Sequence, residues 1–383
     1  MKRALIIAFS NLTHDARVQR QMRWLGKHFH VTAVAYAGSQ APEVELISVP
    51  RPQLTHGRRL WLSFLLIFRF YHRAYWALYR YQQLIPVLKQ QHFDLIVAND
   101  VESLPLAFSL KTQSKIWIDA HEFAPRHFEE KLYWRIFFQR FNQFLCSTYL
   151  PHGNWMTTVS EGLRRAYQDE FHVHPVVLTN ATRYHELSPH PVDPQRIRII
   201  HHGGANPSRQ LELLIEMMAY TDDRFTLDLM LITPALSNAK TSGYVDTLKA
   251  LAGGNPRITF QPPVASDQIV AFIRSYDIGI FVLPPVNFNY ANTLPNKLFD
   301  FIQARLAIAI GPTPEMAGIV KKFNMGVVAE SFDPKEMASR LNSLTAQDIN
   351  HFKLQAHQAA RLLSAEQNEQ IVHKALHALS LVD

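Results

Sequence analysis

The chain of 383 residues lacks the features that mark secreted and membrane-spanning proteins. Its one cysteine, Cys146, excludes an internal disulfide and fits a reducing compartment. The longest apolar stretch, residues 60–68, is far shorter than the roughly 20 residues that span a bilayer. An apolar run near the N-terminus follows two basic residues, as in a signal peptide, but no small-residue cleavage site follows it. We therefore expect a buried first strand and a cytoplasmic protein, free or peripheral on the inner face of the cytoplasmic membrane.

Several ligand-binding signatures are also missing from the sequence. It has no six-residue dinucleotide fingerprint, no P-loop lysine, no Asp-x-Asp after an apolar strand and no His/Cys cluster. These absences argue against dinucleotide, P-loop, metal–diphosphate and zinc sites. The net charge of +7 and the pI of about 9.4 favour anionic partners, such as phosphates, nucleic acid or an acidic membrane surface. We expect no nucleic acid, because no known reading motif is present.

Short apolar, β-branched runs alternate with helical patterns along the whole chain. Such continuous runs indicate strands buried on both faces, and helices between them imply parallel βαβ units. Three prolines between Pro189 and Pro194 interrupt the alternation. We predict two Rossmann-like, doubly wound α/β domains, 1–188 and 195–345, followed by C-terminal helices 346–383. These helices would pack outside the second sheet or cross back to the first domain. Ligands of such sheets bind beyond the carboxyl ends of the strands.

Two stretches of the second half follow predicted strands and suit an anion. In the first, Gly203 and Gly204 permit close backbone approach, and Arg209 adds a charged donor fork at the start of a helix. The alternative is a tight turn with a solvated arginine. In the second, residues 292–294 would begin a helix with free amides, and Lys297 would neutralise a phosphate. Asp300 lies one turn later and would accept hydrogen bonds from a ribose diol; the alternative is a capped helix with both charges in solvent.

The first half also carries polar residues after predicted strands. "IDAHEF" places Asp119, His121 and Glu122 after one strand, where helix capping is the alternative. Asp100 and Glu102 follow another strand, and helix capping is the favoured interpretation for them. After the first strand, Asn11, Asp15 and Arg17 are acceptor-side candidates, although Asp15 and Arg17 are equally explained as the start of the first helix.

The second half, in the order "ITFQPPV", "YDIGIFVLPP" and "NTLPNKLFDFIQARLAIAIGPTPEM", resembles the donor-binding domain of retaining GT-B glycosyltransferases of family 4. "SNLTHDARVQRQMRWLGKHFHVTAVAY" and "IDAHEF" resemble the acceptor-side domain. The similarity runs from about residue 4 to residue 345 and keeps the family's order along the chain. It implies two domains facing a central cleft.

The resemblance assigns roles to individual residues. His121 matches the active-site histidine, and Asp300 matches the acidic residue that binds the donor ribose. The family has two acidic residues in this motif, and Asp300 matches the second of them. Asn292 stands at the position of the first, so its contact with the donor sugar is altered. Gly204 and Arg209 stand where the family tends to carry arginine and lysine after the phosphate loop, so we infer that Lys297 supplies the missing charge. The expected diphosphate contacts are Gly203, Gly204, Arg209, Thr293, Leu294 and Lys297.

The resemblance implies a retaining, metal-independent hexosyltransferase that uses a UDP- or GDP-linked sugar and no cofactor. Its acceptor would be a glycan or a lipid-linked molecule in bacterial surface polysaccharide or glycolipid assembly. The alternatives are a sugar-nucleotide epimerase or hydrolase with the same fold, and a catalytically silent nucleotide-sugar-binding protein.

Residues 58–80 combine basic and aromatic side chains. At about 100° per residue along a helix, four arginines fall on one stripe beside a tryptophan. A basic stripe bordered by large apolar residues is typical of a helix at an anionic membrane surface, and residues 131–144 repeat the mixture. Two core helices with a solvated edge are the alternative. The membrane-contact candidates are Arg58, Arg69, Arg73, Trp76 and Arg80.

Overall fold

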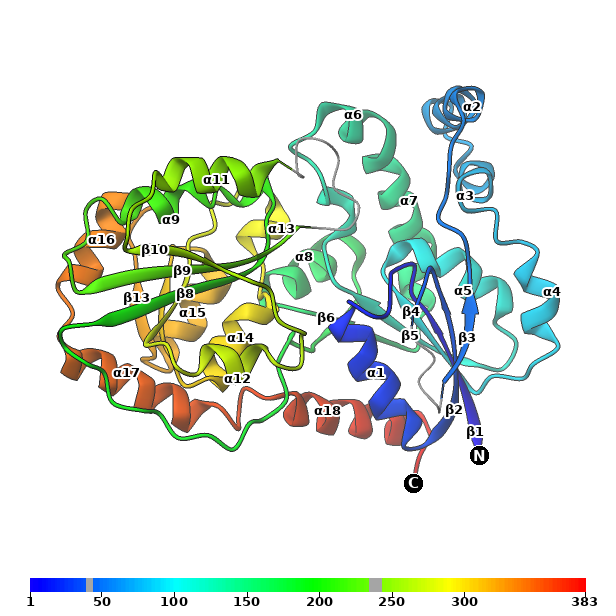
Figure 1. Cartoon of the computed structure of the whole chain (residues 1–383). Helices are drawn as coiled ribbons and strands as arrows, with labels where there is room; N and C mark the ends of the chain where they lie inside the picture. The colour runs from blue at the N-terminus through cyan, green and yellow to red at the C-terminus, as the bar shows by residue number, and fades with distance from the viewer. Residues whose placement is uncertain (39–43, 234–242) are drawn as a thin grey trace. The chain divides into compact units, whose positions relative to one another are not determined.

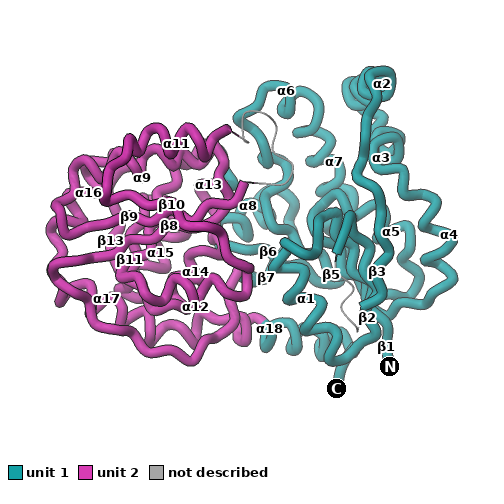
Figure 2. Tube along the Cα trace, viewed as in Figure 1, with its two compact units in different colours: residues 1–179, 287–289, 369–383 teal, residues 180–286, 290–368 magenta. Residues whose placement is uncertain are grey.

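The computed structural model describes residues 1–38, 44–233 and 243–383, and the chain divides into two compact units (Figures 1 and 2). Unit 1 comprises residues 1–179, 287–289 and 369–383, and unit 2 comprises residues 180–286 and 290–368. Each unit contains one parallel sheet. The predicted fold class, two doubly wound α/β domains, is confirmed.

Unit 1 contains a seven-stranded parallel sheet in the order β3-β2-β1-β4-β5-β6-β7. The order reverses direction between β1 and β4, which places the right-handed crossover helices on both faces and the strand ends of β1, β4 and β5 side by side. The strand β3 was not predicted, and β7 is only two residues long. The strands are β1 (Lys2–Ile7), β2 (Phe29–Ala35), β3 (Val44–Ser48), β4 (Leu95–Asn99), β5 (Lys115–Ala120), β6 (Trp155–Thr158) and β7 (Val176–Val177).

The helices of unit 1 pack their apolar residues against this sheet in one continuous core. Residues 369–383 join this unit, since the ammonium group of Lys2 donates to the carbonyls of Ser380 and Leu381. The helices are α1 (Ala16–Gly26), α2 (His56–Ile67), α3 (Tyr71–Tyr79), α4 (Leu84–Lys89), α5 (Leu104–Leu110), α6 (Leu132–Trp134), α7 (Arg140–Tyr149), α8 (Glu161–Phe171) and the end of α18 (Ala365–Ala378).

Unit 2 contains a six-stranded parallel sheet in the order β10-β9-β8-β11-β12-β13. Neighbouring residues along its strands enter different core clusters: Ile199 and Ile280 lie in one, and Ile200 and Phe281 lie in the other. Both faces are therefore buried, which explains the continuous apolar runs. The strands are β8 (Ile197–Gly204), β9 (Phe225–Ile232), β10 (Ile258–Gln261), β11 (Ile278–Phe281), β12 (Ala307–Ile310) and β13 (Gly326–Val328).

The helices of unit 2 include one, α14, that enters the candidate site directly. It follows β11 and the short helix α13, and it ends just before β12. The helices are α9 (Glu212–Met217), α11 (Tyr244–Ala252), α12 (Ile269–Ile273), α13 (Phe288–Ala291, whose first two residues are counted in unit 1), α14 (Asn296–Gln303), α15 (Pro314–Lys322), α16 (Pro334–Asn342) and α17 (Ala346–Ala359).

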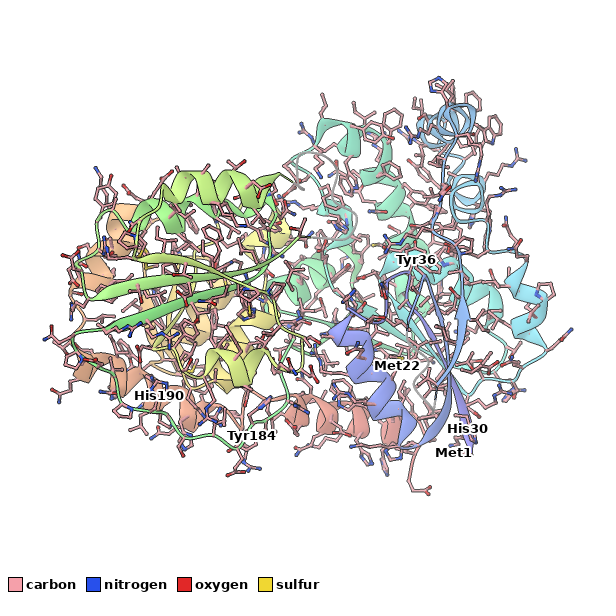
Figure 3. The ribbon with its side chains drawn as sticks, viewed as in Figure 1. Met1, Met22, His30, Tyr36, Tyr184 and His190 are labelled. Atoms are coloured by element: carbon pink, nitrogen blue, oxygen red, sulfur yellow. The ribbon has the colours of Figure 1, made fainter. Side chains whose placement is uncertain are left out.

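The segment between the two sheets belongs to unit 2, so the division at 179/180 precedes the predicted boundary at 188. Residues 178–193 contain no helix or strand, and from residue 180 on they form hydrogen bonds with unit 2. The amide of His185 donates to Gln303, and the imidazole of His190 lies 2.6 Å from the carbonyl of Arg274. Tyr184 and His190 mark this segment in Figure 3. The three prolines located the linker, but they did not mark residue 180, where unit 2 begins.

The predicted continuous basic stripe over residues 58–80 is wrong. The segment forms two helices, α2 and α3, because Arg69 adopts a left-handed conformation with φ of 61°. Arg80 ends α3 in the same conformation. Two helices with a break between them cannot keep one angular register. Arg58 is also engaged, donating to the carbonyls of Gln53 and Ala77. In the part of the chain that the structure describes, no helix is long and apolar enough to cross a membrane.

Candidate functional site

The first candidate site is the carboxyl end of β8, in unit 2. Gly203 has a φ of +123°, a conformation that side-chain-bearing residues rarely adopt. A Cβ at Gly203 would lie 3.3 Å from the ammonium nitrogen of Lys297 and 3.9 Å from a guanidinium nitrogen of Arg209. Because Gly203 and Gly204 have no side chains, their backbone lies directly beside the cations of Lys297 and Arg209.

Arg209 lies on a short 3₁₀ turn rather than at the start of the predicted helix. The turn spans Pro207–Arg209, and α9 begins only at Glu212. The guanidinium of Arg209 folds back and donates to the carbonyl of Gly204 over 3.1 Å. This bond holds a planar, charged donor group at the end of the strand, where it can bind an anion.

Lys297 is a buried cation without an ion pair among the described residues, although the charge of Asp300 acts to raise its pKa. Its side chain is only 5% exposed, and it forms no ion pair with any residue that the structure describes. The ammonium nitrogen lies 3.3 Å from Nε2 of His201 and 3.9 Å from the ring centroid of Phe281. Burial lowers the pKa of Lys297 well below its ordinary value, and the charge of Arg209 lowers it further. A buried ammonium group is costly unless an anion neutralises it, so this position suits an anionic ligand.

His201 is held in a neutral form that accepts from Lys297. Its Nδ1 lies 3.0 Å from the carbonyl of Ile280, and a carbonyl can only accept. The proton therefore sits on Nδ1, which leaves the lone pair of Nε2 facing the ammonium group. Burial, followed by the charge of Lys297, lowers the pKa of His201 well below its ordinary value.

Asp300 lies one helical turn after Lys297 and is 7% exposed. One of its oxygens accepts a 2.6 Å hydrogen bond from the hydroxyl of Thr182, and the other lies 3.6 Å from Nε2 of His202. Burial lowers the pKa of His202 to about 3, so the ring is neutral at pH 7. Its Nε2 has no hydrogen-bond partner among the described residues. The alternative, a capped helix with Lys297 and Asp300 in solvent, is therefore excluded.

Residues 292–294 were predicted to begin helix α14, but they lie before its first residue. The helix starts at Asn296, and Pro295 precedes it with an extended backbone at the cap position. Leu294 is buried, and its carbonyl accepts from the side chain of Asn180. Asn292 and Thr293 are half-buried on the turn after α13. Proline disfavours a helical conformation at the residue before it, which explains the later start. The amides of Thr293 and Leu294 and the sugar contact of Asn292 stay predictions.

A second candidate site lies in unit 1, where His121 follows β5. Its Nδ1 lies 3.2 Å from a carboxylate oxygen of Asp100, and its Nε2 lies 3.1 Å from one of Asp119. The favoured capping role of Asp100 is wrong, because its carboxylate makes no cap bond and accepts instead from the backbone amide of His121. Asp100 itself has a φ of 57°, outside the usual range for a non-glycine residue.

Asp119 is fully buried and accepts several hydrogen bonds. The guanidinium of Arg17 binds both of its oxygens, at 2.6 and 2.7 Å. Gln21 and Thr157 donate to the same carboxylate, and the hydroxyl of Thr157 accepts from the indole of Trp117. This network fixes the carboxylate that orients His121. Sequence reasoning missed Gln21 and Thr157, which no local motif marks.

Charge in this cluster is balanced. Burial alone would lower the pKa of His121, but the charges of Asp100 and Asp119 raise it to about 10. Burial would raise the pKa of Asp119, but Arg17 and His121 hold it far below its ordinary value. At pH 7 the cluster therefore contains two cations and two anions. A histidine that stays protonated cannot act as a general base.

The acceptor-side candidates are used within unit 1. Asp15 caps α1, accepting from the amide of Val18. Arg17 is 6% exposed and is committed to Asp119. The side chain of Asn11 accepts from the amide of Thr13. A contact with an acceptor stays a prediction for all three. Among the residues described, no group of three His, Cys, Asp or Glu side chains is placed to hold a metal ion.

Removing the charge of Asp100 should change the titration of His121. In Asp100→Asn we expect the pKa of His121 to fall from about 10 toward 6.5, because one of two neighbouring anions is lost. Because the pKa of His121 is higher in the folded protein than in the unfolded chain, protonation of His121 stabilises the folded state. This contribution to the free energy of unfolding is complete below about pH 6.5 and is lost as the pH rises through about 10. Histidine NMR titration measures the shift, and an unchanged midpoint would contradict the assigned contact.

The two glycines of β8 should differ in their tolerance of a side chain. Gly203→Ala should destabilise the protein by about 1–3 kcal/mol, because alanine at this φ is strained. Gly204→Ala is the matched control: its φ is not in the strained range and the nearest atom to an added Cβ is 3.6 Å away. We expect it to change stability by less than about 1 kcal/mol. Urea unfolding of both variants tests the difference, and equal losses would refute it.

Comparison with known proteins supports the fold. Neither a protein-family model nor a curated protein matches the sequence. Among solved structures, Anabaena HepE in complex with UDP-glucose is similar, with a TM-score of 0.71 and 13% identity over 99% of this chain and 100% of that one.

Two further solved structures are similar over nearly their whole length. Sucrose-phosphate synthase from Thermosynechococcus elongatus has a TM-score of 0.70 and 12% identity over 99% of both chains. WaaG, a glycosyltransferase involved in lipopolysaccharide biosynthesis, has a TM-score of 0.64 and 13% identity over 97% of this chain and 98% of that one. At these identities the likeness establishes the fold. The chain has the two-domain GT-B fold that its sequence resemblance implied.

Proposed function

We propose that this protein is a glycosyltransferase that binds a nucleotide-diphosphate sugar in unit 2. The observation that carries the proposal is Lys297, a buried cation without an ion pair in the described chain, beside Arg209 and the bare backbone of Gly203. A diphosphate supplies the missing negative charge and fits a strand end without side chains. Asp300, one turn away, suits a ribose diol. The similar HepE structure contains UDP-glucose, which supports the same ligand class.

The proposed reaction transfers the sugar to a hydroxyl of a glycan or lipid-linked acceptor in bacterial surface polysaccharide or glycolipid assembly. The acceptor oxygen forms a bond to the anomeric carbon, while the bond from that carbon to the diphosphate oxygen breaks. The acceptor proton passes to the departing phosphate, so the nucleoside diphosphate leaves. Attack and departure on the same face retain the anomeric configuration.

Each group has a separate part in this proposal. Arg209 and Lys297 stabilise the charge that develops on the diphosphate, so that the reaction is metal-independent. His121, which matches the family's active-site histidine, acts as a fixed positive charge, because its pKa of about 10 excludes the role of base at neutral pH. Because His121 is already protonated, the departing phosphate is the group that accepts the proton of the acceptor hydroxyl.

Substitutions in unit 2 should weaken donor binding selectively. We expect Arg209→Ala and Asp300→Ala each to raise the Kd for the UDP or GDP sugar by about ten- to a hundredfold, through loss of charged hydrogen bonds. A thermal-shift screen identifies the donor, and calorimetry then measures the Kd values. His121→Ala should lose turnover while it keeps donor affinity.

Arg198→Ala is the matched control, since Arg198 lies near the other end of the same strand, β8. It should bind the donor normally. Normal donor affinity in both Arg209→Ala and Asp300→Ala would refute the proposed site. Nucleoside diphosphate release that requires an acceptor separates transfer from hydrolysis and epimerisation. Donor binding without turnover in the presence of any acceptor would favour a catalytically silent binding protein. Asn292 supports that alternative, because it stands where the family has a carboxylate.

A further inference from the structure

Helix α2 presents apolar side chains on both of its sides. Leu62, Leu65 and Leu66 face inward and are buried in the core of unit 1. The opposite side exposes large apolar residues at the spacing of one helical face. These are Leu60, Trp61, Phe64 and Ile67, which are 61%, 54%, 43% and 56% exposed. Water-facing helices normally place polar residues there, so this face is unusual for a free surface.

The exposed apolar surface continues beyond α2. Phe68 and Phe70 extend it along the chain, and the rings of Phe64 and Phe68 pack with centroids 4.6 Å apart. The π-helical turn at residues 135–139 contacts α2 and follows α6, and Figure 1 shows α2 and α6 at one end of unit 1. This second segment exposes Leu132, Tyr133 and Ile136. We call the exposed residues of 60–70 and 132–136 the α2–α6 surface.

The charge within the two segments of this surface is of one sign. Residues 56–80 contain five arginines, residues 131–144 contain one lysine and two arginines, and neither segment contains an acidic residue. Arg59, Arg69, Arg73 and Arg135 are exposed. Glu129 and Glu130, just before the second segment, form ion pairs with Arg126 and with Lys131, the lysine of that segment. Unneutralised cations beside exposed aromatic and aliphatic side chains are complementary to an anionic, apolar partner.

We propose that the α2–α6 surface attaches the protein to an anionic lipid bilayer. The apolar tips of α2 and α6 enter the boundary between headgroups and acyl chains, and the surrounding arginines bind lipid phosphates. This attachment goes beyond sugar transfer and does not depend on it. The proposed membrane contact is an apolar face of α2 with cations from two segments beside it. It differs from the single arginine stripe that the sequence predicted.

Vesicle co-sedimentation tests this attachment. The intact protein should bind phosphatidylglycerol vesicles at low salt and bind phosphatidylcholine vesicles weakly, with binding to the former reduced by high salt. Leu60→Ser/Phe64→Ser should lower the partition coefficient at least about tenfold, because buried apolar area is lost. The matched control is Leu354→Ser/Leu362→Ser, which removes two exposed leucines from unit 2. It should bind like the unmodified protein.

The electrostatic part has its own pair of variants. Arg59→Glu/Arg73→Glu should lower the partition coefficient at least about tenfold. Lys321→Glu/Lys374→Glu makes the same change in net charge at exposed positions outside the surface and should have a much smaller effect. Brominated phosphatidylglycerol should quench tryptophan fluorescence in the unmodified protein and far less in Trp61→Phe, since Trp61 is half-exposed.

Three results would overturn the proposal. They are no binding to anionic vesicles, binding that the α2 variants leave unchanged, and a self-associated protein that Leu60→Ser/Phe64→Ser converts to a monomer. Sedimentation velocity detects the last of these. Vesicle binding needs no nucleotide sugar and donor titration needs no lipid, so the two proposals fail independently.

Discussion

The candidate site of unit 2 depends on one unusual constraint, the burial of the ammonium group of Lys297 without a carboxylate partner. Burial of an unpaired charge opposes folding, and the surrounding residues reduce that cost without removing it. His201 accepts from the ammonium group, and the ring of Phe281 faces it at 3.9 Å. Gly203 leaves the space above it without a side chain. An anionic ligand is the component that completes this arrangement.

The charged cluster of unit 1 has the opposite character. His121 and Arg17 are matched by Asp100 and Asp119, so the cluster is neutral as a whole and is rigid through its hydrogen bonds. Such a network fixes the orientation of His121 before any ligand arrives. Unit 2 therefore contains a buried cation without an ion pair, to which we propose that a diphosphate binds, whereas unit 1 holds a preoriented group.

The sequence predicted the architecture, because apolar runs mark buried parallel strands, and it marked the polar residues that follow those strands as site candidates. Strand β3, "VELIS", was missed because its apolar run is short and mixed. Thr182 was missed because it lies 118 residues from Asp300 in the chain. The break at Arg69 has no glycine or proline beside it, so helical periodicity could not locate it. Contacts that depend on tertiary packing were the ones that sequence patterns could not supply.

Calorimetry of UDP binding in buffers of different ionisation enthalpy tests the central claim most directly. The nearby diphosphate should restore the charged form of Lys297, whose pKa is lowered in the free protein. At a pH of about 9, where the phosphates are already fully ionised, binding should take up a proton, and Lys297→Met should abolish the uptake and most of the affinity. Tight binding with no proton uptake, unchanged in Lys297→Met, would contradict the account.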